Sequence, residues 1–258
     1  MSKRYTSIII SIFLLLFTLQ AQAQQKIKIA CVGNSITEGF LLQNPSEESY
    51  PAVLQKLLGD KYEVGNFGVT AHTLSMKGDL PYMKTQRFQE ALDFLPDIVT
   101  IKLGTNDSKP QNWQHHASFK DDLNLLIDKF QALASHPRIY LCLPIPSNHK
   151  EWGINDSIIV HGIIPYIQEV AAERNLPVID LHTVMLPYYP QLYVDGVHPD
   201  KYGAAIIAET LYRYLTGEEP YPAPGRSDQT LWYDEPAVQW EETLPLGNGR
   251  LGMMPGGA

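Results

Sequence analysis

The sequence predicts an α/β fold in which one mostly parallel sheet is covered by helices on both faces. Short apolar segments rich in β-branched residues alternate along the chain with segments whose apolar residues recur at helical spacing. Strands and helices that alternate in this way form parallel sheets, because each helix returns the chain to the edge where the next strand begins. With 258 residues, of which 44% are hydrophobic, the chain can form one such domain and a small additional segment.

The predicted strands are recognised by apolar runs that end at glycine or proline. The first alternates before it becomes apolar and ends at Gly33. The third (DIVTIKL) is rich in β-branched and apolar residues, as in a buried strand, and ends at Gly104. The fourth is followed by Pro144 and Pro146, which stop it. The predicted strands are residues 26–32, 62–67, 97–103, 138–143 and 177–181.

The predicted helices are recognised by the helical spacing of their apolar residues. Pro51 suits the first turn of its helix, where no backbone N–H is needed. Pro165 is expected in the first turns of its helix or at a kink, because proline cannot donate the helical hydrogen bond. The predicted helices are residues 51–58, 85–94, 118–133, 158–174 and 202–215. Functional residues in such folds gather on loops that leave the carboxyl ends of the strands.

Residues 1–23 are typical of an export signal. Lys3 and Arg4 form a positive start, an apolar run follows from Ile8 to Leu19, and Ala21-Gln22-Ala23 offers small residues for cleavage. The apolar run is shorter than the ~20 residues that a membrane-spanning helix needs. We therefore expect a signal peptide and an exported protein, periplasmic or extracellular, whose mature chain has no stable membrane insertion.

Charge and cysteine content exclude several classes of partner. The formal net charge is -8 and no basic run occurs, so nucleic acid is not an expected partner. Cys31 and Cys142 lie in two different predicted interior strands, which indicates buried free thiols, although export permits a disulfide. No further Cys or His residues stand at zinc-ligand spacing. We expect neither a metal nor a cofactor.

Three residues are candidates for a catalytic serine triad. Ser35 follows the first predicted strand directly, on a turn that can expose its hydroxyl. A serine hydroxyl needs a base to take its proton, and His198 is the candidate base. Asp195 precedes His198 by three residues across Gly196, and a tight turn there would bring its carboxylate to the imidazole. Taken alone, each of these residues is equally compatible with an ordinary turn.

Three donors are candidates for an oxyanion hole. They are the backbone N–H groups of Ser35 and Gly68 and the side-chain amide of Asn106. Gly68 and Asn106 follow the second and third predicted strands, so both should lie at the same sheet edge as Ser35. Donors aimed at the carbonyl oxygen of an ester lower the barrier by about 3–4 kcal/mol each.

In this order, the motifs resemble those of the SGNH hydrolases, a subset of the GDSL esterases and lipases. The matching motifs are GNSIT with Ser35, NFGVT with Gly68, GTND with Asn106, and DGVHP with Asp195 and His198. The resemblance implies a flavodoxin-like three-layer α/β/α fold with a five-stranded parallel sheet over residues 26–216, no metal, and an acyl-enzyme. Many members carry Asp where this chain has Asn34, a position outside the triad. The GNSIT variant resembles exported carbohydrate esterases, including acetylxylan and sialate acetylesterases.

The carboxyl-terminal segment resembles a different family. Residues 217–229 are rich in Pro, Gly and charge, as in a linker. Residues 230–258, with the run LPLGNGRLG, are similar to the start of glycoside hydrolase family 95, which contains α-L-fucosidases. The segment is too short for a domain, so we expect no glycosidase activity from it. Its presence suggests that the esterase acts on the same polysaccharide as a sugar-cleaving module.

The sequence thus predicts an exported serine esterase that removes acyl groups, in the first place acetyl, from a poly- or oligosaccharide. A lipase, phospholipase or thioesterase of the same fold is an alternative, as is an inactive carbohydrate-binding accessory module of a glycosidase. Several aromatic residues could border a substrate or simply pack, and the sequence does not decide between these roles. They are Trp113, Trp152, His72, Tyr188, Tyr189 and Tyr193. The oligomeric state is left open.

Overall fold

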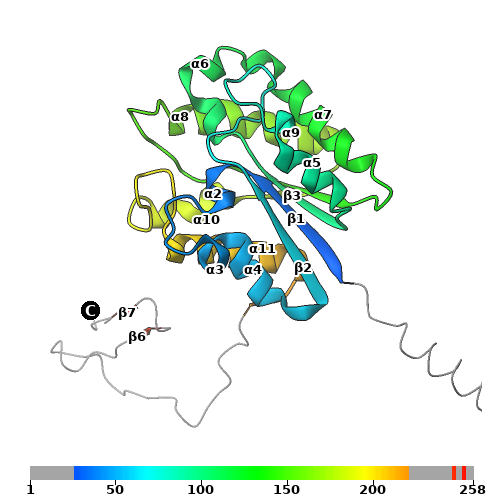
Figure 1. The fold of residues 1–258 in the computed structure, drawn as a ribbon. Helices are drawn as coiled ribbons and strands as arrows, with labels where there is room; N and C mark the ends of the chain where they lie inside the picture. The colour runs from blue at the N-terminus through cyan, green and yellow to red at the C-terminus, as the bar shows by residue number, and fades with distance from the viewer. Residues whose placement is uncertain (1–25, 221–245, 248–251, 254–258) are drawn as a thin grey trace, which may run out of the picture.

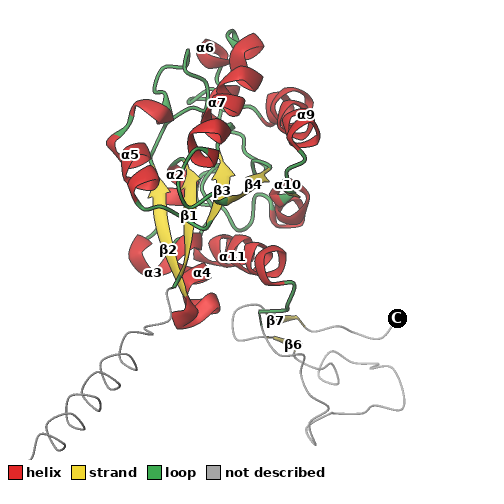
Figure 2. Ribbon diagram, turned by 90° about the vertical axis from the view of Figure 1, so that its right-hand side faces the viewer, coloured by secondary structure: helices red, strands yellow, loops and turns green. Residues whose placement is uncertain are grey.

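The computed structural model describes residues 26–220, 246–247 and 252–253. Within residues 26–220 it has a five-stranded sheet in the order β2-β1-β3-β4-β5, and every neighbouring pair of strands is parallel. The strands are β1 (Ile27–Gly33), β2 (Tyr62–Gly68), β3 (Ile98–Lys102), β4 (Arg138–Cys142) and β5 (Val178–Ile179). The arrowheads of β1, β2 and β3 point the same way in Figure 2, toward α2 (Ser35–Glu38). The predicted flavodoxin-like sheet is confirmed.

Helices cover both faces of the sheet (Figure 1). One layer contains α5 (Gln86–Asp93), α7 (Phe119–Gln131) and α9 (Ile164–Arg174). The other contains α4 (Tyr50–Leu58), α10 (Leu181–Met185) and α11 (Lys201–Thr216). The shorter helices are α3 (Pro45–Glu48), α6 (Pro110–Trp113) and α8 (Asp156–Ile158). The remaining turns are η1 (Gly59–Lys61), η2 (Tyr82–Lys84), η3 (Thr105–Ser108), η4 (His116–Ser118), η5 (Ile159–Ile163) and η6 (Leu186–Tyr188).

Side-chain alternation along the strands divides the core into two clusters. Val32 and Ile101 pack into the cluster that contains α5, α7 and α9 residues, whereas Cys31 and Cys142 pack into the cluster on the opposite face. Both cysteines are buried free thiols, as predicted. Burial raises the pKa of each thiol to about 12, so both are neutral at physiological pH.

Most predicted elements agree with the observed ones to within one or two residues at each end, but two differ more. β5 has only two residues, because the Asp180 side chain accepts from Thr183 N and so begins α10 directly after the strand. The helix predicted over residues 158–174 is divided into α8, a π-helical turn η5 and α9. Pro165 lies in the first turn of α9 and cannot donate a backbone hydrogen bond, which accounts for the irregular turn before it.

Several predictions concern residues outside the described part of the chain. The signal peptide over residues 1–23 and most of the segments 217–229 and 230–258 are in this group. Within the last segment, β6 (Leu246–Gly247) pairs antiparallel with β7 (Gly252–Met253). Among the described helices, none is both long and apolar enough to cross a bilayer. The domain boundaries and the export signal stay predictions.

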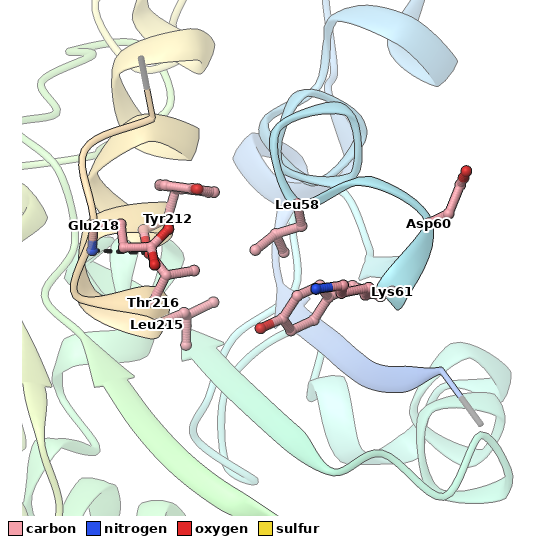
Figure 3. A pocket seen from close by; sticks show the side chains of 8 residues that line it. Leu58, Asp60, Lys61, Tyr212, Leu215, Thr216 and Glu218 are labelled. Atoms are coloured by element: carbon pink, nitrogen blue, oxygen red, sulfur yellow. Dashed lines mark hydrogen bonds between the residues drawn. The ribbon is translucent and has the colours of Figure 1, made fainter. Parts of the chain in front are cut away.

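A hollow of about 630 Å³ lies where the strands begin, at the end of the sheet opposite α2 (Figure 3). One wall is formed by Leu58, Asp60 and Lys61, and the other by the carboxyl-terminal end of α11 from Tyr212 to Thr216. The hollow is therefore remote from the loops that leave the carboxyl ends of the strands.

The buried stripe of α7 offers a direct test of this packing. Leu126 is fully buried, whereas its neighbour Leu125 is 41% exposed. We expect Leu126→Ala to lower the free energy of unfolding by about 2–5 kcal/mol, because it removes buried contacts and leaves a cavity. Leu125→Ala should change it by about 0.5 kcal/mol or less. Urea unfolding followed by circular dichroism measures both; equal losses in the two variants would contradict the packing of α7.

Candidate active site

Ser35 lies where β1 turns into α2. It is the first residue of α2, and the Asn34 side chain caps the helix by accepting from Ile36 N at 3.1 Å. Gly33 permits this sharp turn, because a Cβ there would lie 2.0 Å from Thr37 Oγ1 and 2.9 Å from the Lys102 carbonyl oxygen. Ser35 is consequently held at the carboxyl edge of the sheet with its position set by backbone packing.

The three predicted triad residues meet. His198 Nε2 lies 2.7 Å from Ser35 Oγ, and His198 Nδ1 lies 2.8 Å from Asp195 Oδ2. The other carboxylate oxygen of Asp195 accepts from His198 N at 2.8 Å and from Val197 N at 2.9 Å. Gly196 has φ +81°, a left-handed conformation that favours glycine, and so allows this tight turn. The arrangement orients the imidazole with one nitrogen toward the carboxylate and the other toward the hydroxyl.

The surroundings of His198 favour its neutral form. Burial lowers the pKa of His198 below its ordinary 6.5, and Lys102 and His149 lower it further, against the opposing effect of Asp195. Burial alone would raise the pKa of Asp195, but hydrogen bonds from His198 and Val197 prevail and lower it. At neutral pH the site therefore contains a carboxylate and an uncharged imidazole, the form in which histidine can accept a proton.

Two of the three predicted oxyanion donors, the Gly68 N–H and the Asn106 amide, already have acceptors. Gly68 is the last residue of β2 and is paired with Gly33, and its N–H donates to Asn66 Oδ1 at 3.0 Å. Asn106 donates from Nδ2 to the His72 carbonyl at 3.1 Å, which leaves its second amide hydrogen available. For Gly68 to stabilise an oxyanion, its N–H must be shared with or released by Asn66. The oxyanion roles stay predictions.

Asn66 and Glu38 support these loops and were not predicted as site residues. Asn66 donates to the Thr37 carbonyl at 2.8 Å while accepting from Gly68, and so joins β2 to α2. Glu38 accepts from Thr70 N at 2.6 Å, one turn beyond the serine. Asn66 stands in the same motif as Gly68, but its partner Thr37 is distant in sequence, and no local pattern indicates the contact.

Asp107 anchors the loop that carries Asn106. Its carboxylate is buried and accepts from Ser75 N at 2.8 Å and from Leu74 N at 2.9 Å. Burial raises the pKa of Asp107 to about 6, and these hydrogen bonds oppose the effect. The contacts join the loop after β3 to the segment after β2, and thereby hold Asn106 beside Ala71 and Thr70 in the same cavity wall.

A cavity of about 260 Å³ opens over Ser35 and His198. Two aromatic side chains line this cavity next to His198, the candidate base. The centroid of the Phe40 ring lies 5.0 Å from that of the His198 ring, and the centroid of the Trp152 ring lies 5.7 Å from it. The His149 ring stacks on Trp152 at 4.1 Å, and Trp152 is 41% exposed. Phe40 and Trp152 thus form two apolar walls beside the candidate base.

The other aromatic residues left open by the sequence lie elsewhere. Trp113 packs against His116 and Tyr166, and Tyr189 packs against Tyr193. His72 contributes its backbone carbonyl to Asn106 rather than a cavity-lining ring. Across the described residues, no group of three or more His, Cys, Asp and Glu side chains is arranged to hold a metal ion.

Comparisons with known proteins find similarity over most of the chain. Residues 31–206 match the GDSL-like lipase/acylhydrolase family, and residues 231–258 match the N-terminal domain of glycosyl hydrolase family 65. The chain is 44% identical over 211 residues to an acetylxylan esterase of Xylanibacter ruminicola. This alignment covers 75% of the chain but only 44% of that relative's length.

Solved structures show the same fold. A lipase/acylhydrolase from Enterococcus faecalis is similar with a TM-score of 0.60 and 26% identity, covering 77% of this chain and 100% of the other. A carbohydrate acetylesterase family member from Sinorhizobium meliloti has a TM-score of 0.59 and 20% identity, covering 75% of this chain and 100% of the other.

The electrostatics of His198 can be tested by titration. We expect its imidazole to titrate below the ordinary pKa of 6.5. Asp195→Asn should lower that pKa further, because it removes the carboxylate that favours the imidazolium. NMR of the histidine Cε1–H resonances as a function of pH measures the His198 pKa in wild type and in Asp195→Asn. Asp121→Asn, at an exposed position of α7, is the control. A higher His198 pKa in Asp195→Asn would contradict the assigned pairing.

Proposed function

Because the chain belongs to the GDSL-like lipase/acylhydrolase family, we propose that it is a serine esterase that removes acetyl groups from carbohydrate. The observation that carries the proposal is the hydrogen-bonded series Ser35–His198–Asp195 at the base of a cavity. A neutral imidazole in contact with a serine hydroxyl is the arrangement needed to activate that hydroxyl as a nucleophile.

In the proposed reaction, Ser35 Oγ attacks the acetyl carbonyl while His198 Nε2 takes the hydroxyl proton. Asp195 keeps the other imidazole nitrogen protonated and stabilises the imidazolium. The oxyanion is stabilised by Ser35 N–H, Gly68 N–H and the second amide hydrogen of Asn106. His198 then returns its proton to the sugar oxygen, which leaves as the alcohol. Water, activated by the same imidazole, hydrolyses the acyl-enzyme and regenerates Ser35.

Cavity size and lining support a short acyl group on a sugar. A volume of about 260 Å³ lies below the range of about 300–1,000 Å³ typical of sites for drug-sized ligands. It favours acetyl over the long chains of lipase or phospholipase substrates. Trp152 offers an exposed indole of the kind that stacks on sugar rings. The relative from Xylanibacter ruminicola is named for acetylxylan.

We propose further that the esterase is exported and acts beside a glycosidase. The positive start and apolar run of residues 1–23 support a signal peptide. Residues 230–258 resemble a family 95 glycosidase in sequence, and the match of residues 231–258 to a glycosyl hydrolase N-terminal domain supports a second, sugar-cleaving module. An acylated polysaccharide is then the shared substrate.

The nucleophile is tested by substitution. We expect Ser35→Ala to abolish hydrolysis of a chromogenic acetate ester, because the variant lacks the oxygen that forms the acyl-enzyme. Ser157→Ala, an exposed serine outside the cavity, should keep wild-type kcat/KM. Comparing acetate with octanoate esters tests the acyl preference: wild-type activity in Ser35→Ala would refute the mechanism, and a preference for octanoate would favour a lipase.

The sugar-facing role of Trp152 is tested separately. We expect Trp152→Ala to lower kcat/KM for acetylated xylo-oligosaccharide by about three- to tenfold, since an aromatic contact contributes about 0.5–1.5 kcal/mol. Trp152→Phe should restore most of this loss. A chromogenic acetate ester, which has no sugar ring, should be hydrolysed at a rate within about twofold of wild type. Equal losses on both substrates would assign Trp152 to packing around His198 instead.

A further inference from the structure

Lys102 carries a buried amine that takes no part in the proposed reaction. It is the last residue of β3, its side chain is 1% exposed, and its Nζ has no hydrogen-bond partner. A buried ammonium without partners is strongly destabilising, so such groups are rare and require an explanation. Burial lowers the pKa of Lys102 to about 7, so the amine is uncharged in alkaline solution and becomes charged in mildly acidic solution.

The strand register places Lys102 beneath the serine turn. Its Cα is paired with that of Gly33, two residues before Ser35. Because side chains alternate along a strand, Lys102 points to the same sheet face as Ile98, which packs in the cluster with Cys31 and Cys142. That cluster also contains Ile36 and Val197, the neighbours in sequence of Ser35 and His198. Lys102 therefore lies on the sheet face whose core cluster includes residues next to both Ser35 and His198.

No anion on this face neutralises Lys102. Cys142 on β4 acts on it electrostatically, but burial keeps that thiol protonated. Cys31 on β1 and Tyr50 on α4 are also titratable members of the cluster, and burial raises the pKa of both, so both are uncharged. Tyr140 on β4 is a further titratable member of the cluster. Throughout the described ranges, no carboxylate forms an ion pair with Lys102.

The turn above Lys102 also lacks an anion. Asn34, the residue after Gly33, is fully buried, and its Nδ2 has no hydrogen-bond partner. Its Oδ1 is already engaged as the cap of α2. The turn therefore presents a second unpartnered donor to this region and no negative charge.

His198 is the group on which the charge of Lys102 has a consequence. The charged and titratable groups that act electrostatically on His198 are Asp195 on its own loop, Lys102 on β3, and His149 on the loop after β4. Asp195 favours the imidazolium, whereas Lys102 and His149 oppose it. As pH falls, a proton on Lys102 repels a second proton on His198, because two cations in a poorly solvated region cannot both be neutralised by one carboxylate.

We propose that Lys102 is a positioning residue of the esterase: its buried, unpartnered amine beneath the serine turn opposes protonation of His198, so that the imidazole remains a base in mildly acidic solution. The inference rests on the proposed function for its kinetic consequence, but not for the titration of His198. Lys102 touches neither substrate nor the reacting atoms and acts only through the imidazole. A lysine that merely fills core volume would leave both the titration of His198 and the pH profile unchanged when replaced by methionine.

The test compares the wild-type chain with Lys102→Met. Lys129→Met, at an exposed position of α7, is the control. NMR titration of the His198 Cε1–H should show a higher pKa in Lys102→Met than in wild type and no change in Lys129→Met. For a chromogenic acetate ester, kcat/KM of Lys102→Met should fall about three- to tenfold below wild type at about pH 5.5, since one pKa unit is tenfold in the population of free base. The two proteins should agree within about twofold above pH ~8, where Lys102 of the wild-type chain is uncharged, as the methionine of the variant is at every pH.

Each outcome decides the proposal. An unchanged His198 titration in folded Lys102→Met overturns it, whatever the activity. If the wild-type chain fails to hydrolyse any ester, the proposed function falls and the His198 titration alone decides the inference. If Lys102→Met does not fold, lysine Cε resonances of the wild-type chain decide: one titrating near pH ~7 together with a step in the His198 signal supports the proposal, and titration of every lysine above about pH 9 overturns it.

Discussion

The hydrogen bond of 2.7 Å between Ser35 Oγ and His198 Nε2 joins two residues that are 163 positions apart in sequence. The sheet order makes it possible. β1 lies in the interior of the sheet between β2 and β3, so the turn that follows it is surrounded by the loops after its neighbours. The loop before α11 reaches the same edge, and Tyr193 and Pro199 form a bridge that closes it around Asp195. Every other feature of the site depends on this meeting of the first turn and the last loop.

Close backbone packing holds α2, which begins with Ser35, against β2. A Cβ at Gly68 would lie 2.1 Å from Glu38 N, so β2 approaches α2 more closely than any residue other than glycine permits. Asn66 joins the same two elements by donating to Thr37 and accepting from Gly68. The candidate nucleophile, Ser35, is therefore held by a closely packed frame, as a preorganised catalytic geometry requires. That frame also occupies the Gly68 N–H, which couples oxyanion binding to the Asn66 side chain.

The sequence predicts those features that depend on local pattern. Apolar runs located the strands, and the short motifs around Ser35, Asp195 and His198 identified side chains that the structure brings together. Features that depend on long-range contact were not predictable in this way. The short β5 is a separate case, because the cap that ends it, Asp180 accepting from Thr183 N, is local in sequence and competes with the strand. Asn66 acts through a partner distant in sequence. The cavity walls formed by Phe40 and Trp152 also arise from segments without a shared motif.

Lys102 shows the same limit in another form. The sequence predicts a buried strand over residues 97–103 but gives Lys102 no role, and only the register with Gly33 and its burial reveal an unpartnered amine beneath the turn. Burial and charge together set the protonation of a site, and both are properties of the folded chain rather than of a motif. We therefore assign the proposed chemistry to the triad, and the pH range of that chemistry to Lys102 in the core beneath it.

The central claim is that Ser35 is the nucleophile activated by His198. Reaction of the intact chain with a fluorophosphonate, followed by mass spectrometry of its peptides, tests this claim most directly, because the reagent modifies serines that are activated by a base. The account predicts one covalent adduct on the peptide that contains Ser35, formed at a rate that declines as His198 becomes protonated. An adduct on a different residue, or no adduct while ester hydrolysis persists, would contradict it.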